Sequence, residues 1–232
     1  MKFKIFFSLV FAIFVLPLSL SGDQKSLRQK MKKAKINDEA VYEVEINSPT
    51  GKNKVKMTLK VVAVSITRVK IRKILEWKGQ KVVKTVRFSR VRDLVEQMAK
   101  MLESSWETVS IDKRISSTPE SVTLSEDVKV TKIVEKSIGA NVKKTSKESK
   151  ENTFSCYKVE LNAKGKYPKK SGQDLPVNPK PSTMKMTYYL SEEVPIFGWV
   201  KAEGGITQKL AKGEVQATIR ITLKSYKKIQ EK

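Results

Sequence analysis

Residues 214–226 read EVQATIRITLKSY, and this stretch decides the fold class. Apolar and polar side chains alternate along it, which is the pattern of an extended strand with one face on a core and the other in water. Strands of this kind are typical of antiparallel sheets. We expect the buried face to carry Val215, Ala217, Ile219, Ile221 and Leu223.

The same alternation recurs along most of the chain and predicts about ten strands in all. Turn-forming residues separate the first strands, as expected for hairpins. The further strands are expected at about residues 39–46, 54–62, 65–77, 81–89, 106–111, 128–135, 153–162, 183–190 and 195–201.

Three segments depart from this alternation. Between residues 90 and 104 the apolar side chains follow helical spacing, with Ser89 placed to cap the first turn, so one helix is expected there. Residues 137–152 are rich in Lys and Ser and show no period. Residues 164–181 hold four of the eight prolines and are expected to form a long exposed loop.

These elements predict a mainly β protein. A large antiparallel sheet must close or cover its edges, because open edges invite aggregation. We expect a strongly curved antiparallel sheet or incomplete barrel, with the helix at about residues 90–104 packed on or in its concave face. A two-sheet sandwich is the alternative.

The first residues have the features of a secretory signal peptide, with a basic start, an uncharged run at residues 5–16 and small residues at Ser19 and Ser21. We expect a signal peptide at residues 1–21, a basic segment at 22–38 and one β-rich domain at 39–232. After cleavage no transmembrane span is expected.

The expected compartment follows from this export signal. A lipoprotein signal would need Cys where Asp23 stands, so the chain is expected to carry no lipid anchor. It would then act in the periplasm, at the outer-membrane surface or as a secreted protein.

The composition argues against most enzyme chemistry. The 232 residues include no His and one Cys, which removes imidazole-based catalysis, a Cys-x-x-Cys redox pair and a thiolate zinc site. No phosphate-binding or calcium-binding motif is present. We expect a protein that is not an enzyme and that has neither a cofactor nor a metal. Cys156 is expected to be a small buried side chain.

The net charge of +23 predicts attraction to anions, and the bases gather in two places. Ten bases and one acid, Glu76, lie between residues 66 and 92, and alternation places Arg68, Lys70 and Arg72 on one face. The second place is a short XBBXBX pattern at residues 31–36. The candidate anion-binding residues are Arg68, Lys70, Arg72, Lys73, Lys84, Arg87 and Arg90, with Lys32, Lys33 and Lys35.

Three other candidate contacts concern different partners. Met98, Met101 and Trp199 are candidates for lining an apolar ligand site, so lipid is a candidate partner. Lys232 ends the chain with an ammonium group near a carboxylate, which is what kringle domains of plasminogen recognise. Nucleic acid is not an expected partner of an exported protein.

Two segments carry a resemblance to a group of known proteins. Residues 152–159 read NTFSCYKV, and residues 188–201 read YYLSEEVPIFGWVK. They resemble a "GTFxC … YWxSxxVPxxGxVK" pattern of uncharacterised exported bacterial β proteins, with Asn152 in place of Gly and Tyr189 in place of Trp. Such proteins are similar to the half-barrel lipoprotein carriers of the periplasm. The resemblance implies a curved sheet around a helix and assigns no catalytic residue. Locally, a sheet corner is expected at residues 194–198.

Three functions remain open. The first is a non-enzymatic, adhesin-like envelope or surface protein that binds acidic polysaccharide, lipopolysaccharide, or host matrix and plasminogen through a basic strand platform. The second is a periplasmic lipid or lipoprotein carrier with a concave sheet. The third is a structural envelope protein.

Overall fold

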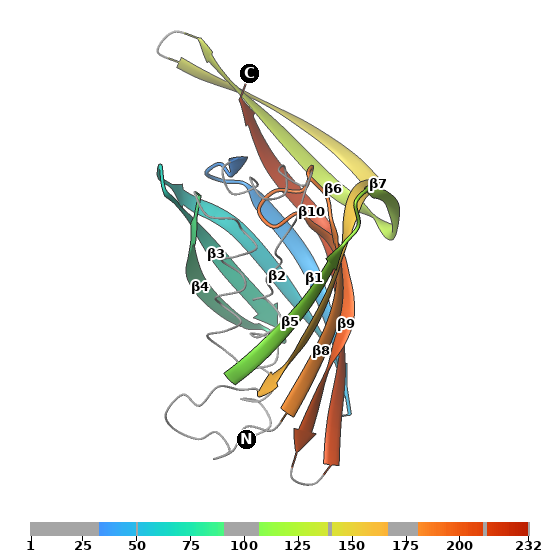
Figure 1. The fold of residues 1–232 in the computed structure, drawn as a ribbon. Coiled ribbons are helices and arrows are strands. Elements are labelled where there is room, and N and C mark those ends of the chain that lie inside the picture. Colours follow the sequence, from blue (N-terminus) through green and yellow to red (C-terminus); the bar gives the residue numbers. More distant parts are fainter. Residues whose placement is uncertain are drawn as a thin grey trace.

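The structure is a computed structural model that describes residues 33–49, 51–90, 107–138, 141–166, 181–210 and 213–231. Within these ranges the chain forms one ten-stranded sheet and no α-helix (Figure 1). The strands are β1 (Glu39–Ser48), β2 (Gly51–Val64), β3 (Arg68–Trp77), β4 (Gln80–Ser89), β5 (Glu107–Ile115), β6 (Glu120–Ile138), β7 (Asn141–Lys166), β8 (Pro181–Leu190), β9 (Trp199–Leu210) and β10 (Gly213–Glu231).

Alternating burial explains why these strands form one sheet around a single core. In β10 the side chains of Ala217, Ile219, Ile221 and Leu223 are buried, whereas their neighbours in sequence are exposed or half-buried. In β1 and β2 the same alternation buries one face of each strand. The expected mainly β fold with a strongly curved sheet is confirmed, and the two-sheet sandwich does not form.

The sheet has a wall and a ring. Strands β4, β3, β2, β1 and β10 are hydrogen-bonded in that order and form the wall. The ring is the closed series of neighbouring strands β10, β6, β7, β8 and β9. It closes because β10 pairs with both ends of the series, with β9 along its first part and with β6 along its last part. The β6–β10 pairing is parallel, and the others are antiparallel. Figure 1 shows β3 and β4 on one side of the curved sheet and β8 and β9 on the other.

The ends of β6 and β7 form an arm that the sequence predicts only in part, since a strand is expected at residues 128–135 but none at 137–152. Residues 137–152 have no apolar period, yet β6 runs to Ile138 and β7 begins at Asn141. For the β7 half the reason is exposure, because residues 144–148 are all exposed and neither face of that segment selects apolar side chains. We name residues 128–138 and 141–151 the β6–β7 arm, which projects from the sheet (Figure 1).

Two other expected segments fall mostly outside the described residues. The helix expected at residues 90–104 does so apart from residue 90. Of the loop expected at 164–181, residues 164–166 belong to β7 and residue 181 to β8, and residues 167–180 lie outside the described part. Residues 1–32, with the expected signal peptide, also lie outside it.

The corner between β8 and β9 joins the two sides of the core. β8 ends at Leu190 and β9 begins at Trp199, so the strand expected at 195–201 starts later and the expected corner precedes it. The Ser191 backbone N–H donates to the Gly198 carbonyl at 2.8 Å, which closes the turn. The Phe197 ring lies 5.3 Å from Phe88 of β4 and 5.0 Å from Trp199. This corner therefore links the edge of the wall to the ring.

Candidate anion-binding surface

The outer side of β3 carries the basic residues that alternation predicts. Arg68, Lys70 and Arg72 are exposed, while Val69 and Ile71 between them are buried. Cross-strand neighbours share a face of the sheet, so their partners identify the rest of this surface. Arg87 of β4 lies opposite Lys70, and Lys60 of β2 lies opposite Arg72. We name the set Lys60, Arg68, Lys70, Arg72 and Arg87 the basic face.

Two lysines expected among the anion-binding residues lie on the other side of the hairpin. Lys73 and Lys84 are cross-strand partners and share the inner face with Ile71. Successive side chains of a strand point to opposite faces of the sheet. Lys73 is one residue from Arg72 and Lys84 is three residues from Arg87, so each lysine lies on the face opposite to that arginine. Lys73 is 7% exposed, and burial, with the nearby Lys84 charge, lowers its pKa to about 7. These two lysines do not belong to the basic face.

Charge pairing distinguishes the basic face from another outward-facing row of residues, four positions beyond Arg72 along β3. In that row Glu43, Lys56, Glu76 and Lys81 follow one another across β1 to β4. The Glu76 carboxylate lies 3.2 Å from Lys56 Nζ and 3.8 Å from Lys81 Nζ. By contrast, no carboxylate among the described residues forms an ion pair with a member of the basic face. The nearest acid by register is Glu39, opposite Lys60.

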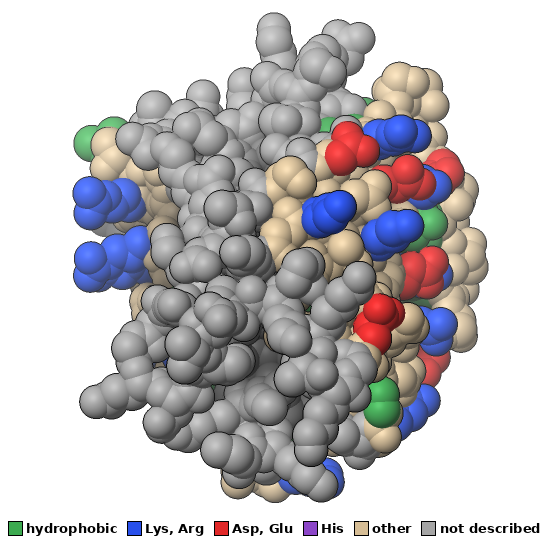
Figure 2. Space-filling view, turned by 60° about the horizontal axis from the view of Figure 1, so that its bottom comes forward, with side chains coloured by type: hydrophobic (Ala, Val, Ile, Leu, Met, Phe, Trp, Pro, Cys, Tyr) green, Lys and Arg blue, Asp and Glu red, His purple; other side chains and the backbone are tan. Residues whose placement is uncertain are grey.

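A space-filling view shows the same contrast on a larger scale. On the side where Figure 1 places β3 and β4, Lys and Arg side chains project without acidic neighbours (Figure 2). On the opposite side of that view, acidic and basic side chains are interspersed. Because no carboxylate of the described residues forms an ion pair with the basic face, its positive charge is uncompensated within the described structure.

Arg90, another candidate anion-binding residue, braces a turn. Its guanidinium Nη1 donates to the Ser65 carbonyl at 3.1 Å, and its backbone N–H donates to the Thr67 carbonyl at 2.8 Å. Both acceptors lie in the turn between β2 and β3. Arg90 is half-buried and acts here as a structural contact at the end of the basic face.

The remaining candidates are not brought together with the basic face. Lys33 is exposed, and Lys35 is half-buried with its backbone N–H donating to the Asp38 carboxylate at 2.8 Å. Trp199 is 2% exposed, with ring centroids of Tyr42 and Tyr188 at 5.8 and 6.0 Å. Cys156 is buried, in agreement with the sequence. Lys32, Met98, Met101 and Lys232 lie outside the described residues.

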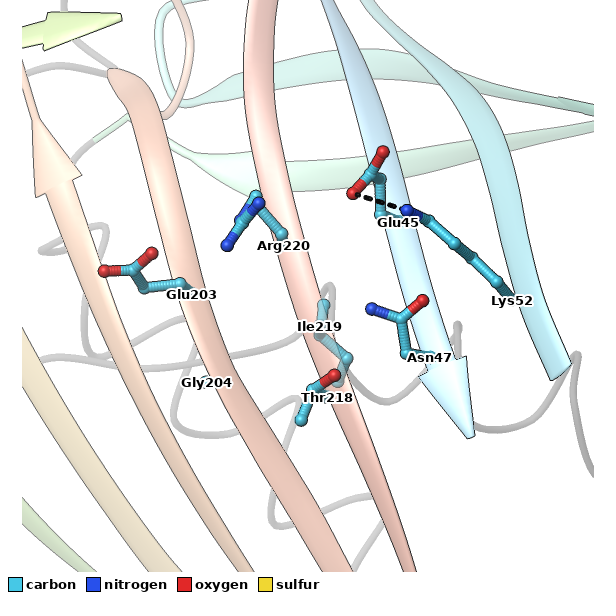
Figure 3. A pocket seen from close by; sticks show the side chains of 8 residues that line it. All are labelled: Glu45, Asn47, Lys52, Glu203, Gly204, Thr218, Ile219 and Arg220. Atoms are coloured by element: carbon cyan, nitrogen blue, oxygen red, sulfur yellow. Dashed lines mark ion pairs between the residues drawn. The ribbon is translucent and has the colours of Figure 1, made fainter. Parts of the chain in front are cut away.

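A shallow pocket that sequence reasoning missed lies on β1, β2, β9 and β10, with a cavity volume of about 190 Å³ (Figure 3). Its only sequence signal is the outward position of Arg220, which lies between Glu45 and Glu203 on neighbouring strands. Lys52 Nζ lies 3.9 Å from the Glu45 carboxylate. Two acids and two bases balance in this pocket, so it offers no net attraction to a charged ligand. Its lining is Glu45, Asn47, Lys52, Glu203, Gly204, Thr218, Ile219 and Arg220.

Two searches of the described residues bear on other kinds of site. They contain no group of three or more His, Cys, Asp or Glu side chains that could hold a metal ion. They also contain no helix long and apolar enough to cross a membrane.

Comparisons with known proteins give one structural similarity. No protein-family model matches the chain, and no curated protein matches its sequence significantly. The fold is similar to a crystal structure described as that of a "putative lipoprotein" from Parabacteroides distasonis, with a TM-score of 0.36 and 14% sequence identity. The similarity covers 83% of this chain and 95% of that one.

Proposed function

We propose that this chain is an exported, non-enzymatic envelope or surface protein that binds anionic partners through the basic face. The observation that carries the proposal is the set of five cationic side chains on adjacent strands with no ion pair to a carboxylate in the described structure. Export rests on the signal-like residues 1–21.

The chemistry of the basic face suits sulfate, phosphate or uronate groups. Arg68, Arg72 and Arg87 offer planar guanidinium groups that can bind an oxyanion through two parallel hydrogen bonds. Lys60 and Lys70 add point charges on the same face. An acidic polysaccharide or the phosphates of lipopolysaccharide would release counterions on binding, so the affinity should fall steeply with salt.

The experiment compares two variants that lose the same charge from different hairpins. In the first, Arg68, Lys70, Arg72 and Arg87 are all changed to Gln. In the matched control, the four exposed lysines of the β6–β7 arm are changed to Gln, namely Lys129, Lys144, Lys147 and Lys150. We expect the first variant to bind a heparin oligosaccharide at least tenfold more weakly than wild type, and the control to bind nearly as wild type. Equal losses in both would show that only net charge matters, and the proposal would fail.

A carrier function is the second candidate, and one observation favours it. The Tyr42 and Tyr188 hydroxyl groups are buried and have no hydrogen-bond partner in the described structure. Both rings lie beside Trp199, inside the curved sheet. Buried polar groups normally have a partner, and a bound ligand could supply one. Native mass spectrometry of protein purified from its own envelope would detect a lipid, whereas an empty protein would argue against a carrier.

A further inference from the structure

The turn between β2 and β3 exposes one aliphatic side chain, that of Ile66, at the end of the basic face. Ile66 is 90% exposed, compared with 50% for Ile36 and 51% for Val83, the other two exposed large hydrophobic residues of the described structure. At the neighbouring β3–β4 turn, by contrast, Trp77 is half-buried and Lys78 Nζ lies 5.1 Å from its ring centroid. Ile66 is therefore the most exposed apolar side chain on this part of the molecule.

The turn that holds Ile66 is well braced. The Ser65 backbone N–H donates to the Arg68 carbonyl at 2.8 Å, and the Arg68 backbone N–H donates to Ser65 Oγ at 3.1 Å. Arg90 adds two more hydrogen bonds to the same turn, to the carbonyls of Ser65 and Thr67. A fixed turn presents Ile66 without an ordering cost at the moment of binding.

The basic residues of β3 lie at increasing distances from Ile66 along the strand. A strand rises about 3.3 Å per residue, so Arg68 lies about 7 Å and Lys70 about 13 Å behind Ile66 along β3. The headgroup layer of a bilayer is about 5–8 Å thick on each side of the hydrocarbon core. With Ile66 at the acyl boundary, Arg68 would lie at the depth of the lipid phosphates. A tilt of the hairpin toward the membrane would bring Lys70 and Arg87 to the same layer.

We infer that the β2–β3 turn is a membrane-docking tip, which inserts Ile66 into an anionic bilayer while the basic face binds the lipid phosphates. The inference rests on the proposed anion-binding function and names its partner as a lipid surface. A soluble polyanion would engage the bases and leave Ile66 in water, so the apolar tip favours the bilayer. Apolar burial and charge attraction together are the usual basis of reversible membrane binding.

The test measures binding to two probes, a heparin oligosaccharide and vesicles of phosphatidylcholine mixed with phosphatidylglycerol. We expect Ile66→Ser to weaken vesicle binding about tenfold, because most of one aliphatic side chain no longer leaves water. The same variant should bind heparin as wild type does. Ile66→Leu should restore vesicle binding, and Val83→Ser, which changes the middle of the same outer surface, should leave it unchanged.

The outcomes separate the inference from the proposed function. Three results would show that the docking tip is wrong: wild type does not bind the anionic vesicles, Ile66→Ser binds them like wild type, or Val83→Ser is the variant that loses binding. Each of these results is compatible with heparin binding by the basic face. If the variant with Arg68, Lys70, Arg72 and Arg87 changed to Gln binds heparin like wild type, the proposed function itself is wrong.

Discussion

The β3–β4 hairpin and the β6–β7 arm are both rich in lysine, but they differ in how that charge is arranged. In the arm the Nζ atoms of Lys129, Lys132 and Lys144 lie within 2.9–3.4 Å of the carboxylates of Glu148, Glu151 and Glu135, respectively. On the basic face no such pair forms in the described structure. The comparison teaches that segments equally rich in bases can differ in how much of that charge is paired, and we use the pairing, rather than the number of bases, to choose the candidate surface.

The two hairpins also differ in burial. In the β7 half of the arm residues 144–148 are all exposed, so both faces of that segment meet water, whereas β3 buries one face against the core. That inner face includes Lys73, which is opposite Lys84. An ammonium group in such a place is costly, because it leaves water and has a like charge beside it.

The largest effect is expected from removing this buried ammonium group. Changing Lys73 to Met should stabilise the protein by about 2 kcal/mol at pH 7, since an apolar side chain suits the inner face better than a charged one. The matched change of the exposed Lys147 to Met should alter stability by less than about 0.5 kcal/mol. Urea unfolding curves measure both. A Lys73→Met variant no more stable than wild type would contradict the burial difference.

Stability should also depend on pH through the same group. In the folded protein the pKa of Lys73 is lowered to about 7, while an unfolded chain keeps this proton up to its ordinary value of 10.5. The unfolded state therefore binds more protons between these values, and stability should rise as pH increases from about 7 to 10. The sequence has no His to obscure this change. Thermal melts should show a smaller rise for Lys73→Met, and equal slopes would count against the assignment.

An intermediate effect is expected from adding the missing acid to the basic face. Thr85 is exposed and lies opposite Arg72, so Thr85→Glu places a carboxylate among the bases. Heparin affinity should fall about fivefold, whereas Thr145→Glu in the arm should change it by less than about twofold. Titration calorimetry at low ionic strength measures both. Equal effects would remove the distinction between the two hairpins.

The smallest effect is expected from removing an acid from the arm. Glu148→Gln frees Lys129, whose Nζ lies 3.2 Å from the Glu148 carboxylate. Because an exposed ion pair contributes only a fraction of a kcal/mol, heparin affinity should rise by about twofold or less. A rise as large as the loss caused by Thr85→Glu would mean that the arm, too, is a binding surface.

The sequence predicts the sheet well where one face of a strand is buried. The alternation in residues 214–226 and 68–77 reports burial directly, and both segments form strands as expected. The strand expected at 128–135 forms part of β6, but the β7 half of the arm was missed because a strand segment exposed on both faces carries no apolar period. The break between β2 and β3 was expected two to three residues too early, because this turn lacks Gly, Pro and Asn and the Ser65 side chain supplies the turn hydrogen bond instead.

The candidate site could be predicted in part. Alternation alone places Arg68, Lys70 and Arg72 together, and counting residues along β4 would have separated Lys84 from Arg87. The inclusion of Lys60 depends on the β2–β3 register, which shifts at a bulge between Val61 and Ala63. The ion pairs of the arm likewise depend on which residues the hairpin brings opposite each other, and no local pattern fixes that.

The measurement that tests the central claim most directly is the salt dependence of heparin-oligosaccharide binding for wild type and the two charge-matched variants. We predict a steep linear fall of log affinity with log salt for wild type and for the variant with four arm lysines changed to Gln. The variant with Arg68, Lys70, Arg72 and Arg87 changed to Gln should have a slope smaller by about three. Equal slopes for both variants would contradict the claim that the unpaired charge of the basic face makes the binding surface.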